Sequence, residues 1–164
     1  MDKEKFIAII KEHQALIYKV CCSYCQDADS RNDLQQDILL QLWGALNKYD
    51  GSTKMTTWVY RIALNTAISF YRKNKKHQEK KISLDDGVII SLPSIEADYQ
   101  HKESIAILYQ FINKLNDFDK ALILLYLDDY KYEEIAEILG ISKTNVATKI
   151  SRIKQILKNQ IANY

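Results

Sequence analysis

Apolar residues recur at helical intervals along almost the whole of this chain of 164 residues. Leu34, Ile38 and Leu42, for example, are spaced to share one face of a helix. No stretch alternates polar and apolar residues for long enough to predict a strand, and only four glycines and one proline interrupt the pattern. The sequence therefore predicts an all-α fold.

The helical spacing lapses between about His77 and His101, where Asp85-Asp86-Gly87 and the only proline, Pro93, occur. Glycine and proline favour turns and linkers over helices. We therefore expect two small helical domains at residues 1–76 and 105–164, joined by a linker at residues 77–104. No apolar run approaches the roughly 20 residues of a membrane-spanning helix, and the N-terminus leads into no signal-peptide core, so we expect a cytoplasmic protein.

The formal net charge of +2 conceals an uneven distribution of charge. Residues 71–81 carry six basic and one acidic side chain, and residues 142–164 carry five basic and no acidic side chains. The intervening residues 82–141 carry four basic and 12 acidic ones. Because phosphate responds to the local field rather than to the total charge, two basic blocks fit a protein that grips a polyanion at two places. Two solvated helix ends are the alternative, since cations gather at helix C-termini.

Residues 132–154 have the pattern of a helix-turn-helix. Gly140 can adopt the positive φ that ends a helix, and Ser142 can cap the helix that follows. The angle between the two helices is expected to be closed by a shared apolar contact of Ile135, Leu139, Ile141 and Val146.

The second helix of this pattern is amphipathic. Val146, Ile150, Ile153 and Leu157 fall on one face. The remaining surface is neutral or basic and comprises Lys143, Thr144, Asn145, Thr148, Lys149, Ser151 and Arg152. Such a helix can enter the major groove, with its first turns at base edges and its later cations at phosphates. We therefore predict binding to duplex DNA, with an ordinary pair of helices as the alternative.

Three acidic residues precede the turn of the helix-turn-helix. They are Glu133, Glu134 and Glu137. Acidic residues favour the start of a helix and can face away from DNA, so these three do not contradict DNA binding.

A polar stripe with an embedded leucine lies on the helix expected at residues 31–46. Its members, at i, i+3, i+4 and i+7, are Asp33, Gln36, Asp37 and Leu40, with Trp43 at the border. Mixed polar and large apolar side chains suit a protein interface. A solvated helix face is the alternative.

A third helix, expected from about Thr57 to Arg72, carries aromatic and hydrogen-bonding groups along one stripe. The stripe comprises Trp58, Arg61, Asn65, Ser69 and Arg72. The core side is expected at Val59, Ile62, Ala63, Thr66 and Phe70. Aromatic rings stack on unpaired bases and cations follow the backbone, so this helix is a candidate platform for single-stranded DNA. Aromatic residues that simply belong to the core are the alternative.

The chain has three cysteines, Cys21, Cys22 and Cys25, with His13 upstream on the same helix. Two thiols at i and i+3 supply half of a structural zinc site, so we expect buried thiols and no bound metal. The three histidines are scattered and no phosphate-binding glycine loop is present. We therefore expect neither an enzyme nor a cofactor.

Two segments of the chain together carry a recognisable pattern. The run Asp33-Leu-Gln-Gln-Asp-Ile-Leu-Leu-Gln-Leu-Trp43, then Tyr49-Asp-Gly51, then Thr57-Trp-Val-Tyr-Arg-Ile-Ala-Leu-Asn65 resembles region 2 of the extracytoplasmic-function (ECF) sigma factors. The block from Leu115 to Leu157 is similar to their region 4. Both parts occur in the family's order and span nearly the whole chain.

The resemblance implies a sigma factor that binds core RNA polymerase and directs promoter-specific initiation. Asp33, Gln36, Asp37 and Leu40 would dock on the clamp of the largest polymerase subunit, and residues 48–56 would form the loop that receives a flipped base of the minus-ten element. Trp58, Arg61, Asn65 and Arg72 would melt and hold that element. The set Lys143, Thr144, Asn145, Thr148, Lys149 and Arg152 would read the minus-thirty-five duplex.

The resemblance also implies an anti-sigma factor as a partner. Two other functions remain open from the residues alone. A stand-alone helix-turn-helix regulator would not need the stripe from Asp33 to Leu40, and a redox-sensing or zinc-sensing protein would depend on Cys22 and Cys25.

Overall fold

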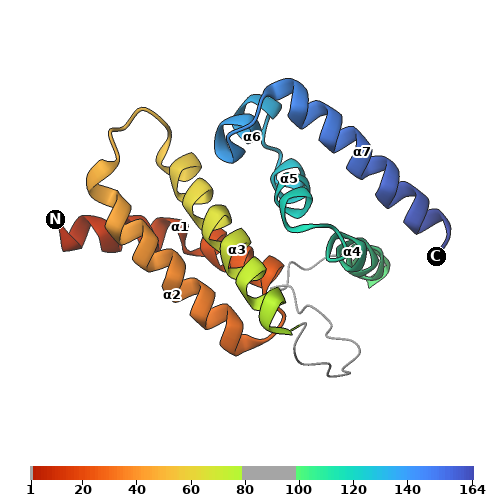
Figure 1. The fold of residues 1–164 in the computed structure, drawn as a ribbon, viewed down its shortest axis with the longest axis horizontal. Coiled ribbons are helices and arrows are strands. Elements are labelled where there is room, and N and C mark those ends of the chain that lie inside the picture. Colours follow the sequence, from red (N-terminus) through yellow and green to blue (C-terminus); the bar gives the residue numbers. More distant parts are fainter. Residues whose placement is uncertain (1, 79–98) are drawn as a thin grey trace. The chain divides into compact units, whose positions relative to one another are not determined.

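The computed structural model describes residues 2–78 and 99–164, and every regular element within those ranges is a helix. The chain divides into two compact units, residues 1–84 and 85–164 (Figure 1). The predicted all-α fold is confirmed. Most of the linker expected at residues 77–104 lies outside the described residues.

Unit 1 consists of three long helices, α1 (Lys3–Tyr24), α2 (Ala28–Ala45) and α3 (Met55–Gln78), with a short 3-10 helix η1 (Leu46–Lys48) after α2. The side chain of Asp2 caps α1, and that of Asp27 caps α2 by accepting from the Ser30 amide at 2.7 Å. Each of the three helices packs on the other two. Leu34, Ile38 and Leu42 of α2 are fully buried, as their spacing predicted.

Helix α3 differs from its prediction in length and in its buried side. It continues to Gln78, six residues past Arg72, into a run of lysines that favour a helix C-terminus. Its buried arc includes Tyr60, Leu64 and Ile68, whereas the predicted core residues Ile62, Thr66 and Phe70 are half-buried. The arc is shifted because α3 packs against both α1 and α2.

Unit 2 contains α4 (Tyr99–Ile112), α5 (Asp117–Leu127), α6 (Tyr132–Leu139) and α7 (Lys143–Ala162). Helix α7 packs on the other three helices, and α5 also packs on α6. The predicted apolar face of α7 is buried, at Val146, Ile150, Ile153 and Leu157. The core of the unit therefore lies along one side of α7, and the opposite side is left for solvent.

The turn between α6 and α7 has the predicted helix-ending glycine and helix-capping serine. Gly140 has a φ of 68°, in the left-handed region, and the Ser142 hydroxyl accepts from the Asn145 amide at 3.1 Å. Ile138, which was not among the predicted contact residues, is 1% exposed, and Ile135 is fully buried. The predicted contact residue Leu139 is only half-buried.

Candidate nucleic-acid and partner interfaces

The outer face of α2 presents all four residues predicted to bind a protein partner. Asp33, Gln36, Asp37 and Leu40 are exposed, while the opposite face of the helix is buried. Leu40 is 66% exposed, which is high for a leucine. An exposed leucine about one turn after Asp37 places an apolar side chain next to polar ones, as in protein interfaces.

Trp43 belongs to the contact between α1 and α2 and not to the open face. Its ring meets the ring of Phe6 edge-on, with centroids 4.9 Å apart and planes at 81°, and its side chain is half-buried. This edge-to-face pair stabilises one end of the α1–α2 packing.

Arg31 fixes the other end of that packing, at the turn from α1 into α2. Its guanidinium donates to the carbonyl oxygens of Gln26 (3.1 Å) and Asp27 (3.2 Å) and approaches the Cys22 sulfur at 3.8 Å. The start of the exposed α2 face is therefore anchored to the end of α1.

The three thiols lie beside this turn. Cys21 and Cys25 are buried and Cys22 is half-buried. Burial, followed by the neighbouring Cys25 and Cys22, raises the pKa of Cys21 to about 12. Among the residues that the structure describes, no three histidine, cysteine or carboxylate side chains converge as metal ligands do.

The loop between η1 and α3 is ordered by its own hydrogen bonds. The Tyr49 hydroxyl donates to the Thr53 carbonyl at 2.5 Å, and the Asp50 carboxylate accepts from the Ser52 amide at 2.9 Å. Hydrogen bonds from the side chain and the backbone amide of Ser52 lower the pKa of the Asp50 carboxyl. Gly51 has a φ of 76°, which allows the tight turn.

An aromatic and cationic surface leads from this loop along α3. Trp58 is half-buried against Tyr49, with ring centroids 5.1 Å apart. Arg61 is half-buried, and Asn65 and Arg72 are exposed further along the helix. The four predicted single-strand contacts therefore follow one side of α3, whereas Tyr60, at 2% exposure, belongs to the core and cannot stack on a base.

The recognition-helix surface is the exposed side of α7 over residues 143–152. Lys143, Thr144, Asn145, Thr148 and Arg152 are exposed, opposite the buried apolar face. The Thr148 hydroxyl donates to the Thr144 carbonyl at 3.0 Å, so it meets a ligand as an acceptor. The predicted residues therefore share one surface, with Lys149 at its half-buried edge.

Two acidic side chains, Glu133 and Asp119, pair with lysines of this surface. Glu133 of α6 forms an ion pair with Lys143, whose hydrogen bond lowers the pKa of the Glu133 carboxyl. Glu133 lies in the first turn of α6 and Lys143 in the first turn of α7, so this ion pair joins the two helices. Lys149 approaches the carboxylate of Asp119, on α5, at 3.7 Å.

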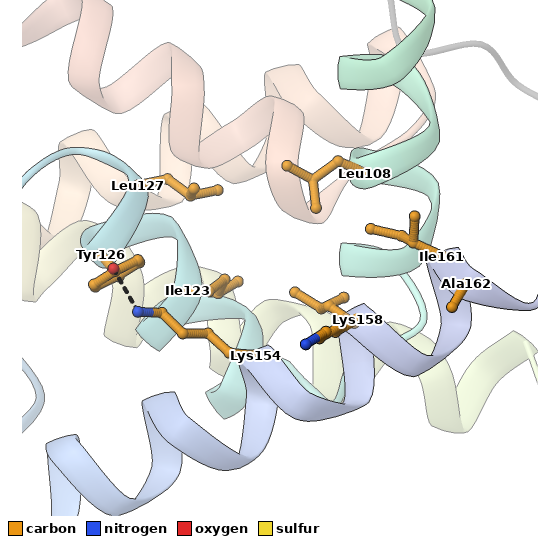
Figure 2. A pocket seen from close by; sticks show the side chains of 9 residues that line it. Leu108, Ile123, Tyr126, Leu127, Lys154, Lys158, Ile161 and Ala162 are labelled. Carbon is orange, nitrogen blue, oxygen red and sulfur yellow. Dashed lines mark hydrogen bonds between the residues drawn. The ribbon is translucent and has the colours of Figure 1, made fainter.

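Unit 2 also carries an apolar groove of about 510 Å³ along the second half of α7 (Figure 2). It is lined by Leu108 of α4, by Ile123, Tyr126 and Leu127 of α5, and by Lys154, Leu157, Lys158, Ile161 and Ala162 of α7. Lys154 donates to the Tyr126 hydroxyl at 2.5 Å, and its ammonium lies 4.0 Å from the centre of that ring. Because its lining comes from three helices, this groove could not be predicted from the spacing of residues along the sequence.

No helix within the described residues is long and apolar enough to span a bilayer. Comparison with family models matches residues 9–77 to Sigma-70 region 2 and residues 105–157 to Sigma-70, region 4. Each of the two matches falls mainly on one of the two units.

Two curated relatives come from Bacillus subtilis. The RNA polymerase sigma factor YlaC is 33% identical over 135 residues, with 81% of this chain and 78% of the relative covered. The ECF RNA polymerase sigma factor SigW is 27% identical over 170 residues, covering 98% of this chain and 90% of the relative.

Two solved structures share the fold. The sigma factor RpoE in complex with the anti-sigma factor NepR, from Bartonella quintana, has a TM-score of 0.72 at 17% identity, covering 98% of this chain and 96% of that one. CnrH in complex with the cytosolic domain of CnrY has a TM-score of 0.69 at 19% identity, covering 99% of this chain and 90% of that one.

Proposed function

Because the chain belongs to the ECF RNA polymerase sigma factors, we propose that it binds core RNA polymerase and directs promoter-specific initiation of transcription in the cytoplasm. It would act by binding and positioning other macromolecules, as a transcription initiation factor and not as an enzyme. Residues 1–76 and 105–164 would be its two working domains, joined by a linker at residues 77–104.

The observation that carries this proposal is that unit 1 exposes two different surfaces on two helices. The face of α2 offers carboxylates around the exposed Leu40, and the side of α3 offers Trp58 and cations. A stand-alone helix-turn-helix regulator needs neither surface, because its duplex contacts come from the helix-turn-helix itself. The sigma-factor function is therefore favoured over that alternative.

We assign the α2 face to the clamp of the largest polymerase subunit. Leu40 would enter an apolar site on the clamp, and Asp33, Gln36 and Asp37 would make polar contacts around it. Truncating a central apolar anchor of this kind weakens binding more than truncating polar residues at the rim.

We assign the loop at residues 48–56 and the α3 surface to the unwound minus-ten element. An extruded base would be received beside the loop, and Trp58 and Arg61 would offer stacking surfaces at the start of α3. Asn65 would donate or accept hydrogen bonds to a base, and Arg72 would meet the DNA backbone. Stacking is worth about 1–3 kcal/mol per base, so a few trapped bases compensate for opening a short stretch of duplex.

We assign the recognition-helix surface to the minus-thirty-five duplex. Lys143, Thr144 and Asn145, in the first turn of α7, would reach base edges. Thr148, Lys149 and Arg152 would reach bases or phosphates one and two turns later. Unit 2 would thereby fix the register of the polymerase on the upstream duplex.

The decisive experiment is transcription in vitro with purified core RNA polymerase and the full chain. We expect co-elution with core, and transcripts that start at a fixed position on promoters selected from a random library. Replacing Trp58 and Arg61 by alanine should preserve core binding but reduce the permanganate reactivity of promoter thymines, while Gln14→Ala, exposed on α1 of the same unit, should not. A chain that neither co-elutes with core nor directs specific initiation would refute the function.

An anti-sigma factor is the proposed regulatory partner, since one of the two solved structures that share the fold is a sigma factor in complex with an anti-sigma factor. The apolar groove between α4, α5 and α7 is the surface that we assign to it. A cognate anti-sigma factor should block promoter-specific transcription by the wild-type chain. Leu127→Glu, at the groove, should relieve that block, and an equal block of the variant would exclude the groove.

A further inference from the structure

Two lysines of the recognition-helix surface are held by carboxylates from two other helices of unit 2. Lys143, in the first turn of α7, pairs with Glu133 of α6. Lys149, nearly two turns later, faces Asp119 of α5 with 3.7 Å between Nζ and Oδ1. The two carboxylates therefore flank the surface that is proposed to meet DNA.

The carboxylate of Asp119 is held in position by Asn116 as well as by Lys149. The Asn116 side chain caps α5 by accepting from the Asp119 amide at 2.8 Å, and its Nδ2 donates to Oδ2 of the Asp119 carboxylate at 2.7 Å. The other carboxylate oxygen, Oδ1, is the one nearest Lys149. The side chain of Asp119 is only 19% exposed, so the surrounding protein restricts its movement.

Lys149 is restrained on a second side by an aromatic ring. Its ammonium lies 5.5 Å from the centre of the Phe118 ring, and its side chain is 32% exposed. By contrast, Arg152 is exposed on the same helix, and it takes no part in an ion pair among the residues that the structure describes. The cations of this surface thus differ in how freely they can move to a phosphate.

On the basis of the function proposed above, we propose that Glu133 and Asp119 are specificity-determining residues of minus-thirty-five recognition. Each holds one lysine against the protein, so a DNA phosphate must displace a carboxylate to obtain that cation. A non-cognate duplex is bound through its phosphates alone, so it must draw both lysines away from their carboxylates, whereas a cognate duplex is held by base contacts to Thr144, Asn145 and Thr148 while the lysines keep their carboxylate partners. The two carboxylates therefore weaken non-specific binding more than specific binding.

The salt dependence of binding provides a quantitative signature. Each lysine that neutralises a phosphate on binding contributes close to one unit to the slope of log affinity against log salt. Glu133→Gln and Asp119→Asn keep the shape of each side chain and remove its charge. The Asp119→Asn amide can still accept from Asn116 through its oxygen, so the cap of α5 is preserved.

The test compares the full chain with the double variant Glu133→Gln, Asp119→Asn, by fluorescence anisotropy with a random-sequence duplex and with a duplex carrying a selected upstream element. We expect random duplex to bind roughly two- to fivefold tighter for each carboxylate removed, the range that the weak energies of exposed ion pairs imply. The slope against salt should steepen by up to about one unit per lysine. Affinity for the selected element should rise less, so the specificity ratio should fall.

A matched control removes one negative charge elsewhere in the same unit. Asp129 is exposed at a positive φ that asparagine tolerates, so Asp129→Asn should leave the specificity ratio unchanged. A second control repeats Glu133→Gln in a Lys143→Gln background, where the effect should vanish because the partner lysine is absent.

An unchanged ratio and slope in the double variant would overturn the proposal. An equal change of the specificity ratio in Asp129→Asn would also overturn it. The same holds if Glu133→Gln still changes the affinity for random duplex in the Lys143→Gln background. Holoenzyme carrying the same variants, challenged with random competitor duplex, should lose promoter-specific transcripts at lower competitor concentration than wild type. If the wild-type holoenzyme makes no specific transcript, the proposed function itself has failed, and the changes on random duplex still decide whether the carboxylates restrain the lysines.

Discussion

The imidazole of His13 joins α1 to the start of α3 through the hydroxyl of Thr56, with 3.2 Å between Nε2 and Oγ1. The other ring nitrogen, Nδ1, lies 2.9 Å from the Ile9 carbonyl. A carbonyl only accepts, so Nδ1 donates, and in the neutral ring Nε2 accepts from Thr56. His13 is therefore a buried polar link between α1 and the end of the loop proposed to receive an extruded base.

We expect His13→Ala to destabilise unit 1 by about 1–3 kcal/mol, since it removes a buried side chain and both of its hydrogen bonds. Both tryptophans, Trp43 and Trp58, belong to unit 1, so urea unfolding followed by tryptophan fluorescence reports on this unit. Thr56→Ser keeps the hydroxyl and is the control. A His13→Ala variant as stable as wild type would show that the link contributes nothing.

Leu40→Ala should weaken binding to core polymerase roughly 5- to 30-fold, the usual effect of truncating a central interface anchor. Its free energy of unfolding should change by less than about 0.5 kcal/mol, because the side chain is mostly exposed. Competition against a labelled wild-type chain for limiting core measures the effect. The neighbouring exposed Gln41→Ala is the matched control, and an equal loss in both variants would contradict the assigned face.

Arg152→Ala should reduce the slope of log affinity against log salt for upstream duplex by about one unit. Lys149→Ala should reduce it by less, because Lys149 exchanges Asp119 for phosphate instead of gaining a new partner. Titrations of the full chain at several salt concentrations give both slopes. Equal reductions would show that the ion pair with Asp119 does not persist in solution.

The buried thiol of Cys21 should make stability fall at alkaline pH. Its pKa is about 12 in the folded chain, against 9.0 for an unperturbed thiol. The unfolded state therefore loses this proton first, and stability should fall as the pH rises from about 9 towards 12, by at most about 1.4 kcal/mol per pH unit.

Urea unfolding at about pH 8 and about pH 10.5, followed by circular dichroism, tests this expectation. The decrease in the free energy of unfolding between the two pH values should be smaller in Cys21→Ala than in wild type. Ile17→Ala, a buried truncation one turn away, should lower stability at both pH values and keep the wild-type loss. If the free energy of unfolding of Cys21→Ala decreases as much as that of wild type, titratable groups other than Cys21 cause the decrease.

Much of the fold could be predicted from the sequence, because helical spacing is a local property. Leu34, Ile38 and Leu42 share a face of any helix that contains them, and that face is buried. Gly140 and Ser142 end one helix and begin the next through their own backbone and hydroxyl chemistry. The exposed candidate residues of α2 and of α7 followed from the same periodicity.

Contacts between helices were decided only by the tertiary structure. Lys143 meets Glu133 and Lys149 meets Asp119 because α5, α6 and α7 cross at particular positions, and spacing along one helix contains no information about that crossing. The burial of Tyr60 in place of Ile62 likewise depends on the combined packing of α1 and α2 on α3. The sequence by itself determined which residues share a helix face, and packing decided which faces are open and which of their charges are already paired.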